Sequence, residues 1–283
     1  MAAVTIQMIK ALQERTGAGI MDCKKALIEA DGDEEKAIDI LREKGIAKAA
    51  SKAGRTAAEG LAFIKVCEKC GRAVIVEVNC ETDFVSGSPK FHEFVDAVTA
   101  RILEKKPATL DEAKEATQDL FTDAVVAMRE NFVLRRFEIL KAEEGEAFGS
   151  YMHMGGKISA LVLLSKDLGD VNRGIAMTVA SADPYYLTLE DVPAEARERE
   201  LALAEKEVAE DPKLAAKPDN VKAMIAERKV ASRLGDNCLD QKAYALDPEG
   251  KLTVAELCKQ KDFQVVKFVR YMVGDGIETK SEE

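Results

Sequence analysis

The sequence contains no tryptophan, and aromatic residues of any kind make up only 5% of its 283 residues. Proteins that hold single-stranded nucleic acid stack the bases on aromatic side chains, and this sequence offers few of them. Basic residues are also in the minority, since 41 lysines and arginines face 51 acidic residues and leave a net charge of −10. Binding to a phosphate backbone needs a basic surface, so direct nucleic-acid binding is not expected.

Long apolar runs are also lacking. No run approaches the roughly 18 residues that indicate a membrane helix. The first residues, MAAVTIQMIKALQERTG, are amphipathic rather than continuously apolar as in a secretory signal. We therefore expect a cytoplasmic protein that does not bind membranes. Cysteines scattered through a long chain fit this location because they are typical of reduced thiols; they are Cys23, Cys67, Cys70, Cys80, Cys238 and Cys258.

The motifs of common active sites are missing from the sequence. No phosphate-binding loop of the form G-x-x-x-x-G-K-[ST] occurs. The stretch GSYMHMGGKI contains a Gly-Lys pair, but Ile158 stands where the hydroxyl group that binds magnesium is required. The only histidines are His92 and His153, and neither comes with a G-x-S-x-G nucleophile motif. We expect no enzyme active site.

One pair of cysteines has the spacing of a metal site. Cys67-Glu68-Lys69-Cys70-Gly71 is how a zinc knuckle begins at a hairpin turn, but a structural zinc site needs about four ligands. Cys80 and His92 could complete the set only if the fold placed them at this turn, and Cys80 should lie well along the partner strand. Two ordinary thiols in the turn are favoured over a metal or redox site, and no metal is expected.

The first 45 residues predict three short helices. Thr5 is suited to cap the first helix and Asp33 the third, which the pair Lys44-Gly45 is expected to close. So small a bundle is marginally stable alone and is more useful as a docking unit. The alanine-rich, basic stretch IAKAASKAGRTAAEG follows as a plausible helical linker. We assign residues 1–55 to a three-helix partner-docking domain with its basic linker.

From Leu61 onward the pattern changes to paired strands. LAFIKV, a turn at CEKCGR and AVIVEVNC predict a β-hairpin, and helices are predicted after it. A second hairpin, AFGSYMHMGGKISALVLLSK, is again followed by a helix. This repetition predicts an α+β core of two similar halves, residues 56–145 and 146–283. A charged helical stretch at about residues 186–235 predicts an inserted antiparallel helical hairpin, which could form a homodimer or contact another molecule.

The junction between the first hairpin and its helix, NCETDFVSGSPKFHEF, contains an aromatic residue in an unusual place. Ser88, with Pro89 at the first helical position, predicts where the helix begins. Thr82–Val85 is therefore expected to lie outside both elements, in a loop of the kind on which a scaffold presents functional groups. Phe84 is either presented there or is a core residue that covers the end of the strand.

Three stretches together closely resemble the bacterial elongation factor Ts family. They are RTGAGIMDCKKAL at residues 15–27, EVNCETDFV at 77–85 and GSYMHMGGKISALVLL at 149–164. Their order and spacing match as well, as do the basic linker, the inserted helical hairpin and the closing FVRYMVGDGIE, so the resemblance covers nearly the whole chain. It implies guanine-nucleotide exchange on elongation factor Tu, the GTPase that delivers aminoacyl-tRNA to the ribosome. No cofactor and no covalent chemistry are implied, because the partner holds the nucleotide.

The resemblance also implies which residues act on the partner. In the family, the Thr-Asp-Phe-Val segment enters the nucleotide-binding domain of the partner and disturbs the magnesium site that holds the diphosphate. The wedge is then Phe84, with Asp83 beside it and Thr82 and Val85 on either side.

Three further residues are expected at the same interface. Ile20 and Met21 correspond to a pair that lies against a helix of the partner's nucleotide-binding domain, although packing within the three-helix domain is the alternative. His153 matches a family position near the interface or is a plain hairpin-turn residue. Because a three-helix domain of this size also resembles ubiquitin-associated domains, a peptide adaptor is the competing function, and the first 45 residues would then suffice.

Overall fold

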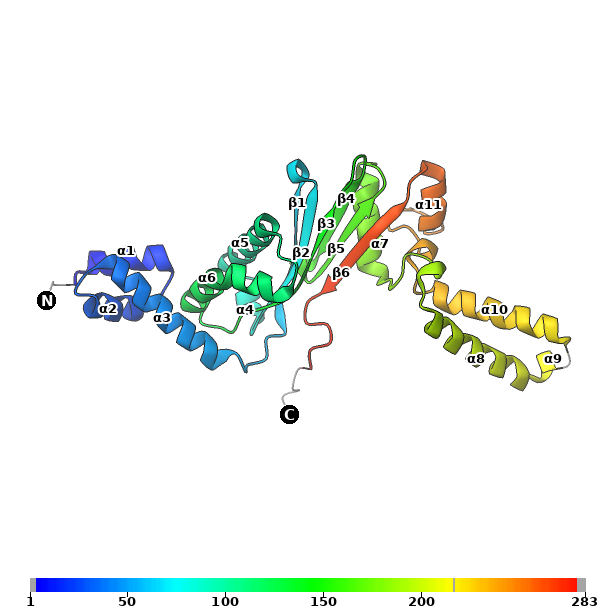
Figure 1. The fold of residues 1–283 in the computed structure, drawn as a ribbon, viewed down its shortest axis with the longest axis horizontal. Coiled ribbons are helices and arrows are strands. Elements are labelled where there is room, and N and C mark those ends of the chain that lie inside the picture. Colours follow the sequence, from blue (N-terminus) through cyan, green and yellow to red (C-terminus); the bar gives the residue numbers. More distant parts are fainter. Residues whose placement is uncertain (1–3, 216, 279–283) are drawn as a thin grey trace. The chain divides into compact units, whose positions relative to one another are not determined.

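The chain forms two compact units in a computed structural model, which describes residues 4–215 and 217–278 (Figure 1). The first unit comprises Met1–Lys141, Met152–Ser159 and Tyr271–Glu283, and the second comprises Ala142–Tyr151 and Ala160–Arg270. In the described residues, helices are combined with two small three-stranded antiparallel sheets, so the predicted α+β class is confirmed.

The helices are α1 (Ile6–Thr16), α2 (Ile20–Glu29), α3 (Glu34–Lys52), α4 (Asp83–Ser86), α5 (Pro89–Lys105), α6 (Leu110–Met128), α7 (Asp170–Ala182), α8 (Ala194–Glu210), α9 (Pro212–Ala215), α10 (Asp219–Gly235) and α11 (Val254–Lys261). The strands are β1 (Glu59–Cys67), β2 (Arg72–Cys80), β3 (Val133–Lys141), β4 (Ala147–His153), β5 (Ile158–Leu164) and β6 (Val265–Met272).

The N-terminal helices are capped by the residues that the sequence indicates. The Thr5 hydroxyl accepts a hydrogen bond from the Met8 amide at 3.2 Å, and the Asp33 carboxylate accepts one from the Lys36 amide at 3.1 Å. Each cap satisfies an amide that has no partner inside its helix. The three helices enclose a small core, which contains Ile9, Leu12, Ala18, Cys23, Ala26, Leu27, Ala30, Ala37 and Leu41.

The third helix is longer than predicted, because Lys44-Gly45 does not end it and α3 continues to Lys52. Gly45 serves the packing of α3 on α6 instead. A β-carbon at Gly45 would lie 2.6 Å from Cγ2 of Val126 and 3.2 Å from Cγ2 of Thr122. The missing side chain thus lets the two helices approach closely, which local sequence does not distinguish from a helix stop.

The first sheet has the strand order β1-β2-β3, with β2 at its centre. In the hairpin, Cys67 pairs with Arg72 beside the turn and Glu59 pairs with Cys80 at the far end. Every residue of β2 after Arg72 is buried, as expected of a central strand. Its valines share one core with α5 and α6, which includes Val74, Val76, Val78, Phe91, Phe94, Val95, Val98, Ile102, Ala113 and Val125.

One carboxylate lies inside the first unit. Glu77 on β2 is 0% exposed, and its oxygens accept hydrogen bonds from Arg135 at 3.0 Å, Arg136 at 2.6 Å and the Gly274 amide at 2.9 Å. The Asn79 side-chain amide donates a further one at 3.2 Å. A buried carboxylate is tolerated only when it is paired in this way. These bonds tie the residues after β6 to the first sheet.

The second unit contains most of the other sheet, whose order is β4-β5-β6. It also carries the predicted helical hairpin, formed by α8 and α10 and linked through α9 (Figure 1). Glu207 on α8 accepts hydrogen bonds from Arg233 at 2.7 Å and Lys229 at 2.9 Å on α10. Between the helices lie the buried side chains of Ala204, Val208, Ala226 and Val230.

Candidate functional site

Thr82–Val85 follows the central strand β2 and lies outside both β2 and α5, as predicted. It is not an irregular loop, however, because Asp83–Ser86 is a single helical turn, α4. Thr82 caps the turn, since its hydroxyl accepts a hydrogen bond from the Val85 amide at 3.3 Å. The Ser86 hydroxyl donates to the Asp83 carbonyl at 3.1 Å. Threonine and serine side chains thus cap this turn. The segment between strand and helix is too short for the sequence to indicate it.

Phe84 points away from the core on this turn. Its side chain is 88% exposed, whereas Val85 beside it packs against the core of the first sheet. A large exposed aromatic ring has no role in stabilising the fold, because it buries almost no area. The alternative that Phe84 covers the end of the strand as a core residue is therefore wrong.

A carboxylate from the end of another helix holds the residues before Phe84. Glu130, just after α6, accepts hydrogen bonds from the amides of Glu81 and Thr82 at 3.0 and 3.1 Å and from the Thr82 hydroxyl at 2.6 Å. Glu81 in turn accepts from the Asn131 amide at 2.7 Å and pairs with Arg55 at 3.3 Å. These reciprocal bonds hold the turn that presents Phe84 in one geometry.

Sequence reasoning missed Glu130. It stands 48 residues after Thr82 in the chain, in a segment without any recognisable motif. A carboxylate near a helix end is a common feature and gives no sign that it reaches a distant strand. Only the pairing of β2 with β3 brings it to the turn.

Ile20 and Met21 form the exposed first turn of α2, with 57% and 60% of their surfaces accessible. Cys23 and Leu27 on the same helix face the three-helix core instead. The packing alternative for the pair therefore fails. Asp22, the next residue of α2, pairs with Arg129 at 3.0 Å, which ties the start of α2 to the end of α6.

His153 is the last residue of β4 and is exposed. The turn Met154–Gly156 follows it, and Gly155 and Gly156 both have positive φ angles, of 67° and 97°. All the predicted contact residues thus belong to the first unit, but they lie in three separate places: the start of α2, the capped turn α4 and the end of β4.

The cysteine pair and Cys80 stand at opposite ends of the first hairpin, because Cys67 pairs with Arg72 and Cys80 with Glu59. Burial, together with the nearby Glu130 carboxylate, raises the pKa of Cys80 to about 12. Across residues 4–215 and 217–278, no group of three or more His, Cys, Asp or Glu side chains is placed to hold a metal ion. The fold does not bring Cys80 to the turn that contains the other two thiols.

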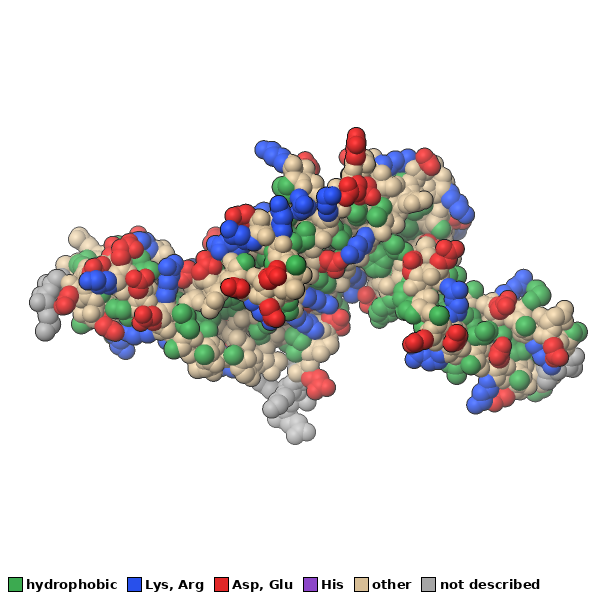
Figure 2. Space-filling view, viewed as in Figure 1, with side chains coloured by type: hydrophobic (Ala, Val, Ile, Leu, Met, Phe, Trp, Pro, Cys, Tyr) green, Lys and Arg blue, Asp and Glu red, His purple; other side chains and the backbone are tan. Residues whose placement is uncertain are grey.

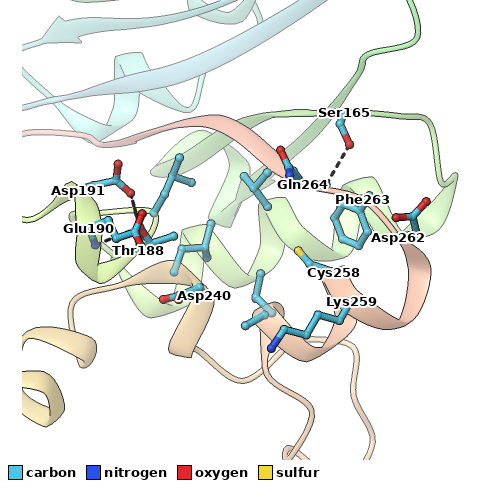
Figure 3. A pocket seen from close by; sticks show the side chains of 15 residues that line it. Ser165, Thr188, Glu190, Asp191, Asp240, Cys258, Lys259, Asp262, Phe263 and Gln264 are labelled. Carbon is cyan, nitrogen blue, oxygen red and sulfur yellow. Dashed lines mark hydrogen bonds between the residues drawn. The ribbon is translucent and has the colours of Figure 1, made fainter. Parts of the chain in front are cut away.

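The second unit contains an open pocket of about 810 Å³, shown in Figure 3. Its lining is acidic, with one lysine, Lys259, against four carboxylates, Glu190, Asp191, Asp240 and Asp262. Cys258 lies among the apolar side chains. Several of these groups serve the local fold: Asp191 closes the cap at Thr188, for example. The pocket contains none of the residues predicted to act.

A comparison with known protein families matches residues 81–275 to the family described as Elongation factor TS. The matched segment is more than half of the chain and begins at Glu81, directly before the turn that carries Phe84. The chain belongs to the elongation factor Ts family. Members of this family are nucleotide-exchange factors for elongation factor Tu in translation. The family assignment predicted from the three sequence stretches is confirmed.

Figure 2 shows acidic and basic side chains intermingled on the face drawn, without a continuous basic stripe there. Within the described residues, no helix has both the length and the apolar character needed to cross a membrane.

Proposed function

We propose that the protein releases GDP from elongation factor Tu by inserting Phe84 into the nucleotide-binding domain of that GTPase. The observation that carries the proposal is the 88% exposure of an aromatic ring on a turn whose backbone is fixed by hydrogen bonds. Burying such a ring in a partner contributes about 1.5–3 kcal/mol. The exposed ring is thus a source of binding free energy that can be spent on distorting the partner.

The target of the distortion is the magnesium ion that holds the diphosphate in the partner. Mg²⁺ requires nearly ideal octahedral geometry from its oxygen ligands, so a small displacement of those ligands lowers its affinity. Without the ion, the negative charge of the diphosphate is no longer neutralised and GDP leaves. Coupling between two ligands is reciprocal, so bound nucleotide weakens the grip of the exchange factor by the same factor, and incoming GTP releases it.

The neighbours of Phe84 have supporting roles in this proposal. Thr82 and its bonds to Glu130 fix the turn before binding, which reduces the entropy lost on association. Val85 anchors the turn in the core, and Asp83 is exposed beside the wedge, where it can reach polar groups of the partner.

Ile20, Met21 and His153 are proposed as docking contacts. An exposed methionine beside an aliphatic residue makes an adaptable apolar contact, which suits the surface of a partner helix. His153 adds a polar group at the end of β4, in the same unit. Together these contacts place Phe84, while Phe84 itself performs the displacement.

The proposal includes no covalent chemistry, no cofactor and no direct contact with nucleic acid, in keeping with the net charge of −10. A cytoplasmic location follows from the same role in translation. We also propose that the helical hairpin α8–α10 forms a homodimer, since Leu203 and Met224 on it are half-exposed apolar side chains.

The test is the release of a fluorescent GDP analogue from elongation factor Tu. The wild-type protein should accelerate release, and Phe84→Ala should reduce the acceleration at least about tenfold, which corresponds to about 1.4 kcal/mol in the barrier. Tyr185→Ala is the matched control, because it removes another exposed aromatic ring, in the second unit.

The two possible failures test different parts of the proposal, the role of Phe84 and the exchange function itself. Equal acceleration by wild type and Phe84→Ala would keep the exchange function and reject Phe84 as the wedge. No acceleration by the wild type would reject the function for this chain and favour the peptide adaptor.

A further inference from the structure

The turn between β1 and β2 carries two cysteines that nucleotide exchange does not use. Cys67 is the last residue of β1, and Cys70 is the last residue of the 3-10 turn Glu68–Cys70. Both side chains are partly exposed. The turn lies at the free end of the hairpin, drawn at the top of the cyan strands in Figure 1.

The turn brings the two thiols together. Ends of a four-residue turn have Cα atoms less than about 7 Å apart, a range that overlaps the separation found in disulfides. The Cys70 thiol donates to the Cys67 carbonyl at 3.5 Å, so its side chain is folded back over the turn toward Cys67. Gly71, at a φ of 58°, and a bond from the Arg72 guanidinium to the Cys70 carbonyl at 3.2 Å fix this arrangement.

The two thiols differ in acidity. A hydrogen bond from the Cys70 side chain lowers the pKa of Cys67, and the positive charges of Lys69 and Arg72 lower it further. The same interaction raises the pKa of Cys70. One thiol is thus favoured as the thiolate that attacks, and its neighbour stays protonated until it is needed.

We propose that Cys67 and Cys70 are a reversible dithiol–disulfide site whose substrate is a low-molecular-weight disulfide such as glutathione disulfide. The Cys67 thiolate attacks one sulfur of the disulfide, forms a mixed disulfide and expels one thiolate. Cys70 then loses its proton, attacks the Cys67 sulfur, forms the Cys67–Cys70 bond and expels the second thiolate. The protein gives up two electrons and two protons, and one small disulfide becomes two small thiols.

The remaining cysteines are poorly suited to this chemistry. Cys23, Cys80 and Cys238 are buried. Cys258 is partly exposed, but burial raises its pKa, and Figure 3 shows it among the side chains of the pocket in the second unit. A raised pKa disfavours the reactive thiolate, so oxidation is expected first at the hairpin turn.

The proposal is independent of the exchange mechanism. Eight residue-to-residue steps of extended strand lead from Arg72 to Cys80, which is about 26 Å at 3.3 Å per residue. The turn that carries Phe84 begins beyond Cys80. Oxidation of the thiol pair therefore adds a second, separate property to the chain.

The experiment incubates the full chain with glutathione disulfide, with and without a chelator, and then alkylates the free thiols before peptide mass spectrometry. The wild type should lose two alkylatable thiols and gain a Cys67–Cys70 disulfide that reduced glutathione reverses. Cys70→Ser should accumulate glutathione on Cys67. Cys67→Ser should form no intramolecular disulfide at the turn, and any glutathione bound there should be on Cys70. Cys258→Ser is the control and should form the Cys67–Cys70 disulfide as the wild type does.

Three results would overturn the proposal: no disulfide at the turn in excess oxidant, equal reactivity of Cys67 and Cys258, or thiols that resist oxidation until the chelator is added. The last result would indicate a metal site instead. Because exchange activity is not the readout, failure here would leave the proposed function of Phe84 untouched.

Discussion

At the scale of single residues, the position of Phe84 depends on a carboxylate far away in the chain. Glu130 accepts three hydrogen bonds from Glu81 and Thr82, and those donors lie directly before the turn α4. Hydrogen bonds to a charged acceptor are the stronger ones, and partly buried donors that lose them are costly. The exchange activity should therefore respond to Glu130 even though this residue is not the wedge.

Glu130→Ala should lower the free energy of unfolding by about 1–3 kcal/mol, because it leaves two amides and a hydroxyl without their acceptor. It should also reduce GDP release severalfold while Phe84 is intact. Glu130→Gln keeps one acceptor oxygen, so its stability and its exchange activity should lie between those of the wild type and Glu130→Ala. Chemical denaturation and the GDP-release assay measure these effects, with the exposed Glu144→Ala as control. Wild-type exchange in Glu130→Ala would show that the turn needs no such support.

The sequence predicted the segment that presents Phe84 and not its support. Ser88, Pro89 and the end of a β-branched strand locate the junction, because capping and propensity are local effects. The one-turn helix at Asp83–Ser86 was missed, since four residues are too few for a helical period. Glu130 could not be predicted, because its contacts depend on the pairing of strands that are remote in sequence.

At the scale of elements, Gly45 sets how closely α3 and α6 approach. Gly45→Val should destabilise the first unit by about 1–3 kcal/mol, because its side chain would overlap Val126 and Thr122. Gly54→Val is the matched control, since a β-carbon there meets nothing within 4 Å. Thermal unfolding measures both variants. If Gly45→Val and Gly54→Val melted at the same temperature, close packing of α3 on α6 would contribute nothing to stability.

The helical hairpin should be sensitive to acid. Hydrogen bonds from Arg233 and then Lys229 lower the pKa of Glu207 below its ordinary value of 4.5. The charged form is favoured in the folded hairpin, so the stabilisation is present above the unfolded value and is lost as the pH falls through the lowered folded value. Hydrogen exchange, corrected for the pH dependence of intrinsic amide exchange, gives the opening equilibrium constant of α8. From about pH 5 to about pH 3 this constant should rise less steeply in Glu207→Gln than in wild type. A variant that follows the wild-type profile would contradict this assignment, and Glu205→Gln on the exposed side of α8 is the control.

The order of elements could be read from the sequence more fully than their ends. Both β-hairpins, the capped helices and the helical insertion follow from alternating strands, cap residues and turn residues. The end of α3 could not be predicted, because tertiary packing and not local chemistry determines the use of Gly45. The predicted division at residues 55 and 145 stays a prediction.

At the scale of the whole molecule, the proposed homodimer is open to a direct test. Leu203 and Met224 are the exposed apolar side chains to change, and replacing both with glutamate should place charge in the interface. Sedimentation equilibrium should give a dimer for the wild type at tens of micromolar and a monomer for the double variant. Tyr185→Ala should stay dimeric. A wild-type monomer under these conditions would reject the proposed interface.

The insertion leaves and re-enters the second unit at one point. The amides of Tyr185 and Tyr186 both donate to the Asn237 carbonyl, at 2.9 and 3.2 Å, and Tyr186 forms a bridge with Cys238. The fold of the rest of the second unit therefore does not depend on the length of the hairpin. Adding seven residues to α8 and seven to α10 would carry the tip about 10 Å further out. The hairpin can thus act as an adjustable ruler, whose reach can change while the unit that holds it stays the same.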